Sequence, residues 1–213
     1  MIIMGFSTLQ TFPLIEGLTG PQTLDVLHKR ITALGARVSG QFVVDCETYF
    51  SAPSLLPGNS QRVLNVLHNT EEPASVFAIL EGGAKQPVLV ADTLLDALLP
   101  KMAVLYTSNK KQTRIESKGN RYEMGDFVVK LGSVTMSGSF KGILVEVCYL
   151  ACVVPALCWE MVWEFMQSFL GSTVPSTLPP YIQSRQNATF SPTDTIQMYL
   201  EKFNEFRKQT VAR

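Results

Sequence analysis

Asp45 and Glu47 form the strongest acidic pair in the sequence, within a segment that alternates like a β-strand. Because side chains at positions i and i+2 of a strand point the same way, both carboxylates face one side. Paired carboxylates can hold a hard divalent cation, as a metal-dependent phosphohydrolase of the β-tunnel type would require. Such an enzyme needs several acidic pairs on facing strands, and the sequence offers only this one. A polar outer face or a cross-strand ion pair is therefore the better interpretation.

Other catalytic side chains are scarce. The sequence has no G-x-G-x-x-G, G-x-x-x-x-G-K-[ST], G-x-S-x-G or H-E-x-x-H motif. Of its two histidines, His28 is expected on the solvated side of a helix. His68 ends a strand before a turn, where a structural hydrogen bond is expected. We therefore predict no catalytic residue and no cofactor.

The cysteines do not suggest a metal site. All four lie among apolar residues: Cys46, Cys148, Cys152 and Cys158. The last three are spaced C-x3-C-x5-C, which is not a usual zinc pattern. Buried free thiols are typical of a reducing compartment and argue against a reactive thiolate.

A locally basic stretch runs from Lys101 to Tyr122. Within it, a nucleic-acid binder would use Lys110, Lys111, Arg114 and Lys118. Over the whole chain, however, 18 Lys and Arg residues balance 18 Asp and Glu residues, whereas phosphate binding usually brings a basic excess. Only Tyr106 and Tyr122 could stack on bases there, so a solvated loop and strand edge is favoured and no sequence-specific nucleic-acid contact is predicted.

Hydrophobic periodicity predicts an α+β fold. Helices are expected at Pro21–Leu34, Asp92–Met102 (ended or kinked by Pro100), Leu157–Leu170 and from Ser191 onward. Strands are expected at Gln41–Phe50, Val63–His68, Ser75–Glu81, Pro87–Ala91, Thr113–Ser117, Arg121–Val134 and Gly142–Tyr149. The order favours an antiparallel, barrel-like curved sheet of about eight strands, flanked by one N-terminal and two C-terminal helices.

The composition indicates a single domain, residues 1–213, with a surface poor in charge. Hydrophobic residues make up 46% and charged residues 17% of the chain. A surface short of charge often serves a partner. The first residues lack the features of a signal peptide, and the longest apolar run, Val147–Trp159, is too short to cross a bilayer. Trp159, Trp163, Phe165 and Phe169 on one helix could anchor a partner or pack in the core.

Several strings resemble the Mediator complex subunit 20 (TRF-proximal protein) family, in order and over nearly the whole chain. They are FVVDCETY at Phe42–Tyr49, HNTEEP at His68–Pro73, LVADT at Leu89–Thr93, the segment Arg121–Met136, EFMQSFLG at Glu164–Gly171 and SPTDT at Ser191–Thr195. Together these strings are highly specific.

The resemblance implies a non-catalytic transcription coregulator in the nucleus, in the head module of Mediator. It implies pairing with Mediator subunit 18, near a C-terminal helix of subunit 8, and contact with the TATA-binding protein. No membrane association is expected. For the partner interface we predict the outer side of the Asp126–Tyr149 hairpin, at Val129, Leu131, Val145 and Val147.

Overall fold

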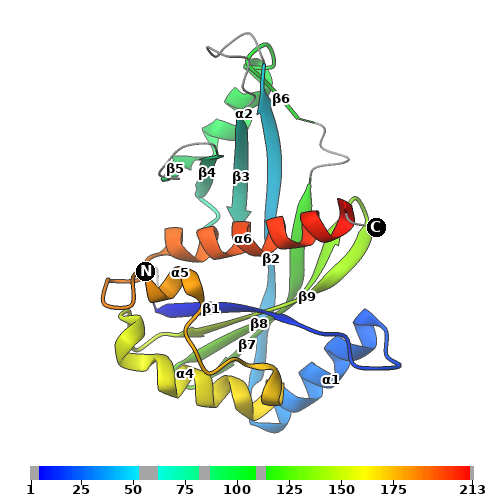
Figure 1. Ribbon diagram of the computed structural model, residues 1–213, viewed down its shortest axis with the longest axis vertical. Coiled ribbons are helices and arrows are strands. Elements are labelled where there is room, and N and C mark those ends of the chain that lie inside the picture. The colour runs from blue at the N-terminus through cyan, green and yellow to red at the C-terminus, as the bar shows by residue number, and fades with distance from the viewer. Residues whose placement is uncertain (1–4, 53–61, 82–86, 109–113, 212–213) are drawn as a thin grey trace. The chain divides into compact units, whose positions relative to one another are not determined.

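The computed structural model describes residues 5–52, 62–81, 87–108 and 114–211. Nine strands form a mostly antiparallel sheet in the order β1-β9-β8-β7-β2-β3-β4-β5, and β6 pairs with β2 (Figure 1). The strands are β1 (Phe6–Phe12), β2 (Arg37–Ser51), β3 (Val63–Asn69), β4 (Ser75–Glu81), β5 (Val88–Asp92), β6 (Tyr106–Thr107), β7 (Ile115–Met124), β8 (Phe127–Met136) and β9 (Ser139–Tyr149). The helices are α1 (Gly20–Ala33), α2 (Leu94–Lys101), α4 (Pro155–Leu170), α5 (Pro180–Gln183), α6 (Pro192–Val211) and the 3-10 helix η2 (Gly171–Thr173).

The predicted α+β class with an antiparallel sheet is confirmed, with three differences in detail. The sheet does not close into a barrel among the described residues, since its order begins at β1 and ends at β5. Strand β1 was not predicted, because its sequence FSTLQTF does not alternate cleanly. Five of its seven residues are buried, so both of its faces are covered and the usual inside–outside pattern is lost. The long strand predicted at Arg121–Val134 is in fact two, separated by a turn at Gly125, whose φ of 55° suits glycine.

Contacts divide the chain into two compact units. The first comprises Met1–Phe42, Lys118–Val134 and Phe140–Arg213, and the second comprises Val43–Ser117 and Thr135–Ser139. The single domain expected from the sequence stays a prediction. None of the helices in the described ranges combines the length and apolar character needed to cross a membrane.

The first unit has an aromatic core between its helices and strands. On α4, Phe165 stacks on Phe127 of β8 with ring centroids 4.0 Å apart. On α6, Phe206 packs over Gly142 of β9, where a Cβ atom would lie 2.5 Å from the ring. Helix α1 begins with a capping box at Thr19 and runs beside α4 (Figure 1). In this unit, helix propensity, capping and aromatic packing therefore all favour the observed helices.

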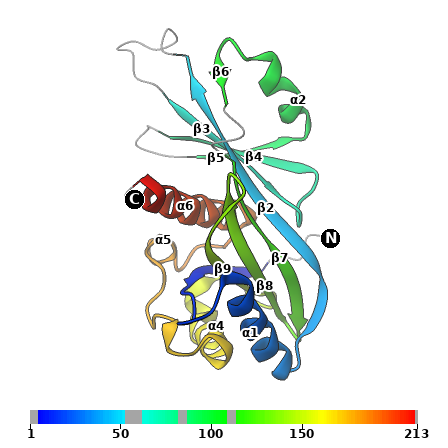
Figure 2. The same cartoon turned by 90° about the vertical axis from the view of Figure 1, so that its right-hand side faces the viewer.

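The second unit is built on the neighbouring strands β2, β3, β4 and β5, with α2 directly after β5 (Figure 2). Its core joins Tyr49, Val66, Val76 and Leu99, so α2 packs on the sheet face that these strand residues share. As predicted for Pro100, α2 ends one residue later, because proline supplies no backbone N–H for a further turn.

Candidate protein-interaction site

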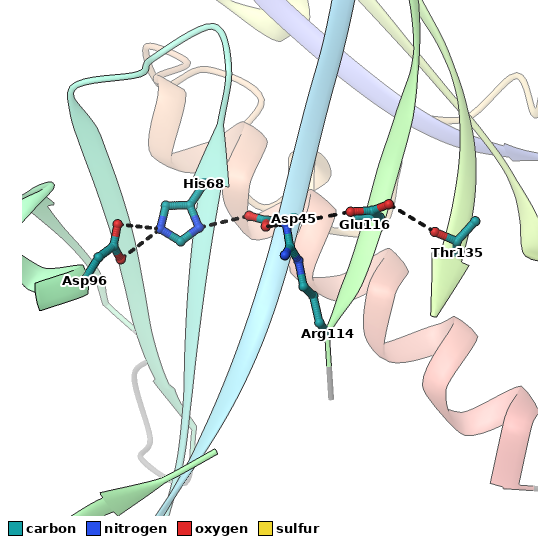
Figure 3. Close-up of polar contacts among 6 residues, drawn as sticks. All are labelled: Asp45, His68, Asp96, Arg114, Glu116 and Thr135. Carbon is teal, nitrogen blue, oxygen red and sulfur yellow. Dashed lines mark hydrogen bonds and ion pairs between the residues drawn. The ribbon is translucent and has the colours of Figure 1, made fainter. Parts of the chain in front are cut away.

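A row of polar side chains in the second unit joins α2 to the sheet (Figure 3). Asp45 of β2 lies directly opposite His68 of β3 in the strand register. The Nδ1 atom of His68 is 2.9 Å from the Asp45 carboxylate, and its Nε2 atom is 3.0 Å from the carboxylate of Asp96 on α2. His68 therefore bridges the sheet and the helix, and its predicted structural hydrogen bond is confirmed.

The two carboxylates keep this histidine protonated. The hydrogen bond to Asp45 is the main cause that raises the pKa of His68 to about 9. Burial by itself would raise the pKa of Asp45, but the hydrogen bond and charge of His68, together with Arg114, lower it below its usual value. At neutral pH the row therefore consists of a cationic imidazole between two carboxylates.

The row continues across the sheet through Arg114 and Glu116. Arg114 donates a 2.6 Å hydrogen bond to the second carboxylate oxygen of Asp45 and lies 3.8 Å from Glu116. The Glu116 carboxylate also accepts a 3.4 Å hydrogen bond from the Thr135 hydroxyl. Because both oxygens of Asp45 are engaged, its carboxylate serves the cross-strand ion pair and is not left open for a metal.

The second carboxylate of the phosphohydrolase hypothesis, that of Glu47, lies beside a tyrosine. Burial, together with this neighbouring carboxylate, raises the pKa of Tyr49. Within the ranges that the structure describes, no group of three or more His, Cys, Asp or Glu side chains could hold a metal ion. The geometry of this face is that of a structural network, which fixes α2 on the sheet.

Helix α2 has leucines both on the side that faces the core and on the side that faces solvent. Leu95 and Leu99 pack against the core. Leu94 and Leu98, one helical turn apart, are 71% and 49% exposed. On the preceding strand, Leu89 and Val90 are exposed as well. We call these four residues the β5–α2 surface; Leu89 and Val90 are consecutive in a strand and point to opposite faces of the sheet, so only one of them can lie on the same side as α2.

The four residues predicted for the partner interface are buried within the chain. Val129, Leu131, Val145 and Val147 are each at most 3% exposed. The reason is that consecutive residues along β8 and β9 are buried, so both faces of these strands are covered and neither is an outer side. Whether a partner reaches these four residues stays a prediction, but their side chains belong to the chain's own core.

The basic stretch is described only in part. Lys110 and Lys111 lie outside the described residues. Arg114 pairs with Asp45, as above, and Arg121 pairs with Glu123. Lys118 instead lines a groove of about 540 Å³ in the first unit.

The expected solvated position of His28 is wrong. Its side chain is half-buried, with Nδ1 2.9 Å from the Tyr122 hydroxyl, because α1 packs against the residues of β7.

Of the four aromatic residues of α4, Trp159 and Phe169 are buried, whereas Trp163 and Phe165 are partly buried. The Nε1 atom of Trp159 donates a 3.1 Å hydrogen bond to the carbonyl of Ser176. The exposed apolar residues of this helix are Leu157 and Met161 instead.

Comparison with known proteins agrees with the resemblance. The family model described as "TATA-binding related factor (TRF) of subunit 20 of Mediator complex" matches residues 4–204. The chain belongs to this family. It is 53% identical to Mediator of RNA polymerase II transcription subunit 20 of Anopheles gambiae, over 98% of this chain and 97% of that protein. The subunit 20 proteins of Drosophila melanogaster and Homo sapiens are 48% and 43% identical, over 96% and 97% of this chain and 87% and 96% of theirs.

Solved structures match less closely than these sequences. A chain of the Schizosaccharomyces pombe Mediator head module is 12% identical, with a TM-score of 0.36, over 79% of this chain and 95% of that chain. The PH1012 protein of Pyrococcus horikoshii is 14% identical, with a TM-score of 0.46, over 82% and 96%. Membership of the Mediator subunit 20 family therefore rests on the sequence comparisons.

Sequence reasoning missed the β5–α2 surface, although a signal was present. The helix LLDALLPK has leucines at positions 94, 95, 98 and 99, which is more apolar than one buried stripe requires. The surplus pair, Leu94 and Leu98, is the pair that the structure leaves outside.

Proposed function

We propose that this protein is a non-catalytic subunit of the Mediator complex, which links activators to RNA polymerase II in the nucleus through protein–protein contacts. The observation that carries this proposal is the 53% identity to a Mediator subunit 20 over nearly the full length of both chains. The network at Asp45 fits this role, since its carboxylate is used for structure rather than for chemistry.

The finer part of the proposal concerns the partners. We propose that the chain pairs with Mediator subunit 18 close to the C-terminal helix of subunit 8, and that it contacts the TATA-binding protein. The family resemblance supports this choice of partners. The β5–α2 surface supplies a physical basis, because burying an exposed leucine contributes about 1.5–3 kcal/mol.

A co-purification experiment tests the pairing. Subunit 18 is expressed together with the full chain, either unchanged or carrying Leu94→Asp and Leu98→Asp. We expect the unchanged chain to retain subunit 18 and the double variant to lose it, because two carboxylates would be buried in an apolar interface. Both leucines are exposed, so the variant should fold.

A matched control carries Leu157→Asp and Met161→Asp, an exposed pair with the same spacing on α4 of the first unit. It should retain subunit 18. If the α2 variant also retains subunit 18, the β5–α2 surface is not the interface. If the unchanged chain, purified from nuclear extract, brings down no Mediator subunit at all, the proposed function itself fails.

A further inference from the structure

The two outermost strands of the sheet differ in exposure. Strand β1, at one end of the strand order, has five of its seven residues buried. Strand β5, at the other end, has no buried residue among its five (Figure 1). Within the residues that the structure describes, β4 is the only strand paired with β5. The outer edge of β5 therefore has backbone N–H and C=O groups without a strand partner in this part of the chain.

Strand β5 exposes apolar side chains on both faces of the sheet. Leu89 lies opposite Ala78 of β4, which lies opposite Val66 of β3, and residues paired in this way share one face. Val66 belongs to the core on which α2 packs, so Leu89 lies on the α2 side. Val90, the next residue, lies on the opposite face. Leu89 and Val90 are 58% and 56% exposed, so each face has one apolar side chain that is mostly in water.

A further β-strand is the structure that can cover both side chains at once. A helix or loop that packed on the α2 side would cover Leu89 and leave Val90 in water. A strand added at the outer edge would place side chains beside both, because its successive residues alternate between the two faces. Its backbone would also pair with the N–H and C=O groups at that edge of β5.

The sequence of β5 lacks the features that usually protect an edge strand from pairing. The segment Val88–Ala91 contains no charge and no proline, and its register with β4 runs without a bulge. Pro87, directly before it, has no backbone N–H to offer. At the other end, the Asp92 carboxylate accepts a 2.9 Å hydrogen bond from the backbone N–H of Leu94, where α2 begins. The edge open to an added strand is therefore the length of β5 itself.

We propose that an extended segment of the partner subunit adds to the sheet as a further strand at the outer edge of β5. The segment has two consecutive apolar residues, one packed beside Leu89 and the next beside Val90. It has no acidic residue opposite Asp92, because like charges directly opposite one another are destabilising. This inference rests on the proposed function for the identity of the partner, subunit 18, and adds the way in which that partner binds.

Amide hydrogen exchange of the full chain, alone and with subunit 18, tests the proposal. Alternate amides within Val88–Asp92 should exchange quickly in the free chain and become protected in the complex. Docking through side chains alone would leave their exchange unchanged. If the chain retains subunit 18 and these amides gain no protection, this inference fails and the proposed pairing stands. If the chain does not retain subunit 18, the proposed pairing fails, and this inference with it.

Variants of the two exposed residues distinguish strand addition from docking on one face. Leu89→Lys places a charge on the α2 side and Val90→Lys on the opposite face, and both should reduce the retention of subunit 18. Both residues are more than half exposed, so the variants should fold. The control Val90→Thr keeps a β-branched side chain without a charge and should retain subunit 18.

Two results would overturn the proposal. The first is a Val90→Lys variant that retains subunit 18 as fully as the unchanged chain, because the partner would then contact the α2 side alone. The second is protection of the β5 amides in the free chain together with a doubled mass in solution, which would assign the edge to a second copy of this chain.

Discussion

Two polar networks each hold a helix against a sheet in this protein, one exposed and one buried. In the second unit, Asp96 of α2 contacts His68, whose side chain is 37% exposed. In the first unit, the Tyr199 hydroxyl of α6 donates a 2.8 Å hydrogen bond to Glu146 of β9. Glu146 in turn pairs with Lys130 of β8 at 3.1 Å, and the side chains of the pair are only 3% and 6% exposed.

The two networks differ in how much their ion pairs matter for stability. When a buried pair loses one partner, the other charge stays in a poorly solvated place, which costs about 3–5 kcal/mol. When an exposed pair is broken, water solvates both groups, and the cost is about 0.2–1 kcal/mol. We infer that α6 is held by a buried network within the core of its unit, whereas α2 is fixed on the sheet by a network that solvent can reach.

The largest effect is expected for Glu146→Ala. It leaves the Lys130 ammonium buried without its carboxylate, so the free energy of unfolding should fall by about 3–5 kcal/mol. Urea denaturation followed by tryptophan fluorescence measures this change in the correct unit, because Trp159 and Trp163 both belong to the first unit. The double variant Lys130→Met, Glu146→Leu should recover most of the loss. A loss below 1 kcal/mol for Glu146→Ala would show that water reaches the pair.

A smaller effect is expected for Tyr199→Phe, which removes one hydroxyl and keeps the ring. The Glu146 carboxylate then loses its only hydrogen bond from α6 among the described contacts, and the predicted loss is about 1–3 kcal/mol. The same fluorescence-monitored denaturation applies. In the Lys130→Met, Glu146→Leu background, Tyr199→Phe should cost much less, because the carboxylate is gone. An equal cost in both backgrounds would mean that ring packing, rather than the hydrogen bond, positions α6.

These two networks also show what the sequence can and cannot predict. Strand alternation predicted either a polar outer face or a cross-strand ion pair at Asp45. The structure has such an ion pair, between Asp45 and His68. The identity of that partner did not follow, because the register of β2 and β3 depends on the residues that connect them. The contact with Asp96 depends on how α2 packs after β5, which no local pattern encodes.

The buried pair was missed although its signal was plain. Lys130 interrupts the apolar run FVVKL, and Glu146 interrupts LVEV. One charge of each sign within two apolar strands is typical of a buried ion pair, because an unpaired charge would not be tolerated there. The interface prediction at Val129 and Val147 rested on the same runs. In a sequence, an unbroken apolar run does not show whether its side chains form an outer face or lie in the core, and here they are buried.

A third, weaker effect is expected for His68→Gln, which removes the charge between Asp45 and Asp96. The predicted loss is about 0.5 kcal/mol, since the imidazole is partly exposed. Its pH dependence is distinctive. The folded pKa is raised from 6.5 to about 9, so the stabilisation is complete below pH 6.5 and is lost as the pH rises toward 9.

Two measurements check this behaviour. An NMR titration of the imidazole signals, with His68→Gln used to assign them, should give His68 a midpoint raised above its ordinary value of 6.5. The stability difference between the unchanged chain and His68→Gln should shrink over the same pH range. A midpoint at the ordinary value of 6.5 would mean that the two carboxylates do not hold the proton.

The smallest effect is expected for Lys202→Ala, on the same helix as Tyr199. Lys202 pairs with Glu205 at 2.9 Å, three residues along α6, and the Glu205 side chain is 51% exposed. Such a pair contributes about 0.2–0.5 kcal/mol, so the fluorescence-monitored denaturation curve should hardly move. Tyr199→Phe and Lys202→Ala change one helix at positions three apart and differ mainly in burial. If both variants lower the free energy of unfolding by the same amount, the stability of helix α6 itself, rather than the buried carboxylate, would hold this helix in place. The contrast with α2 would then have to be explained by helix length.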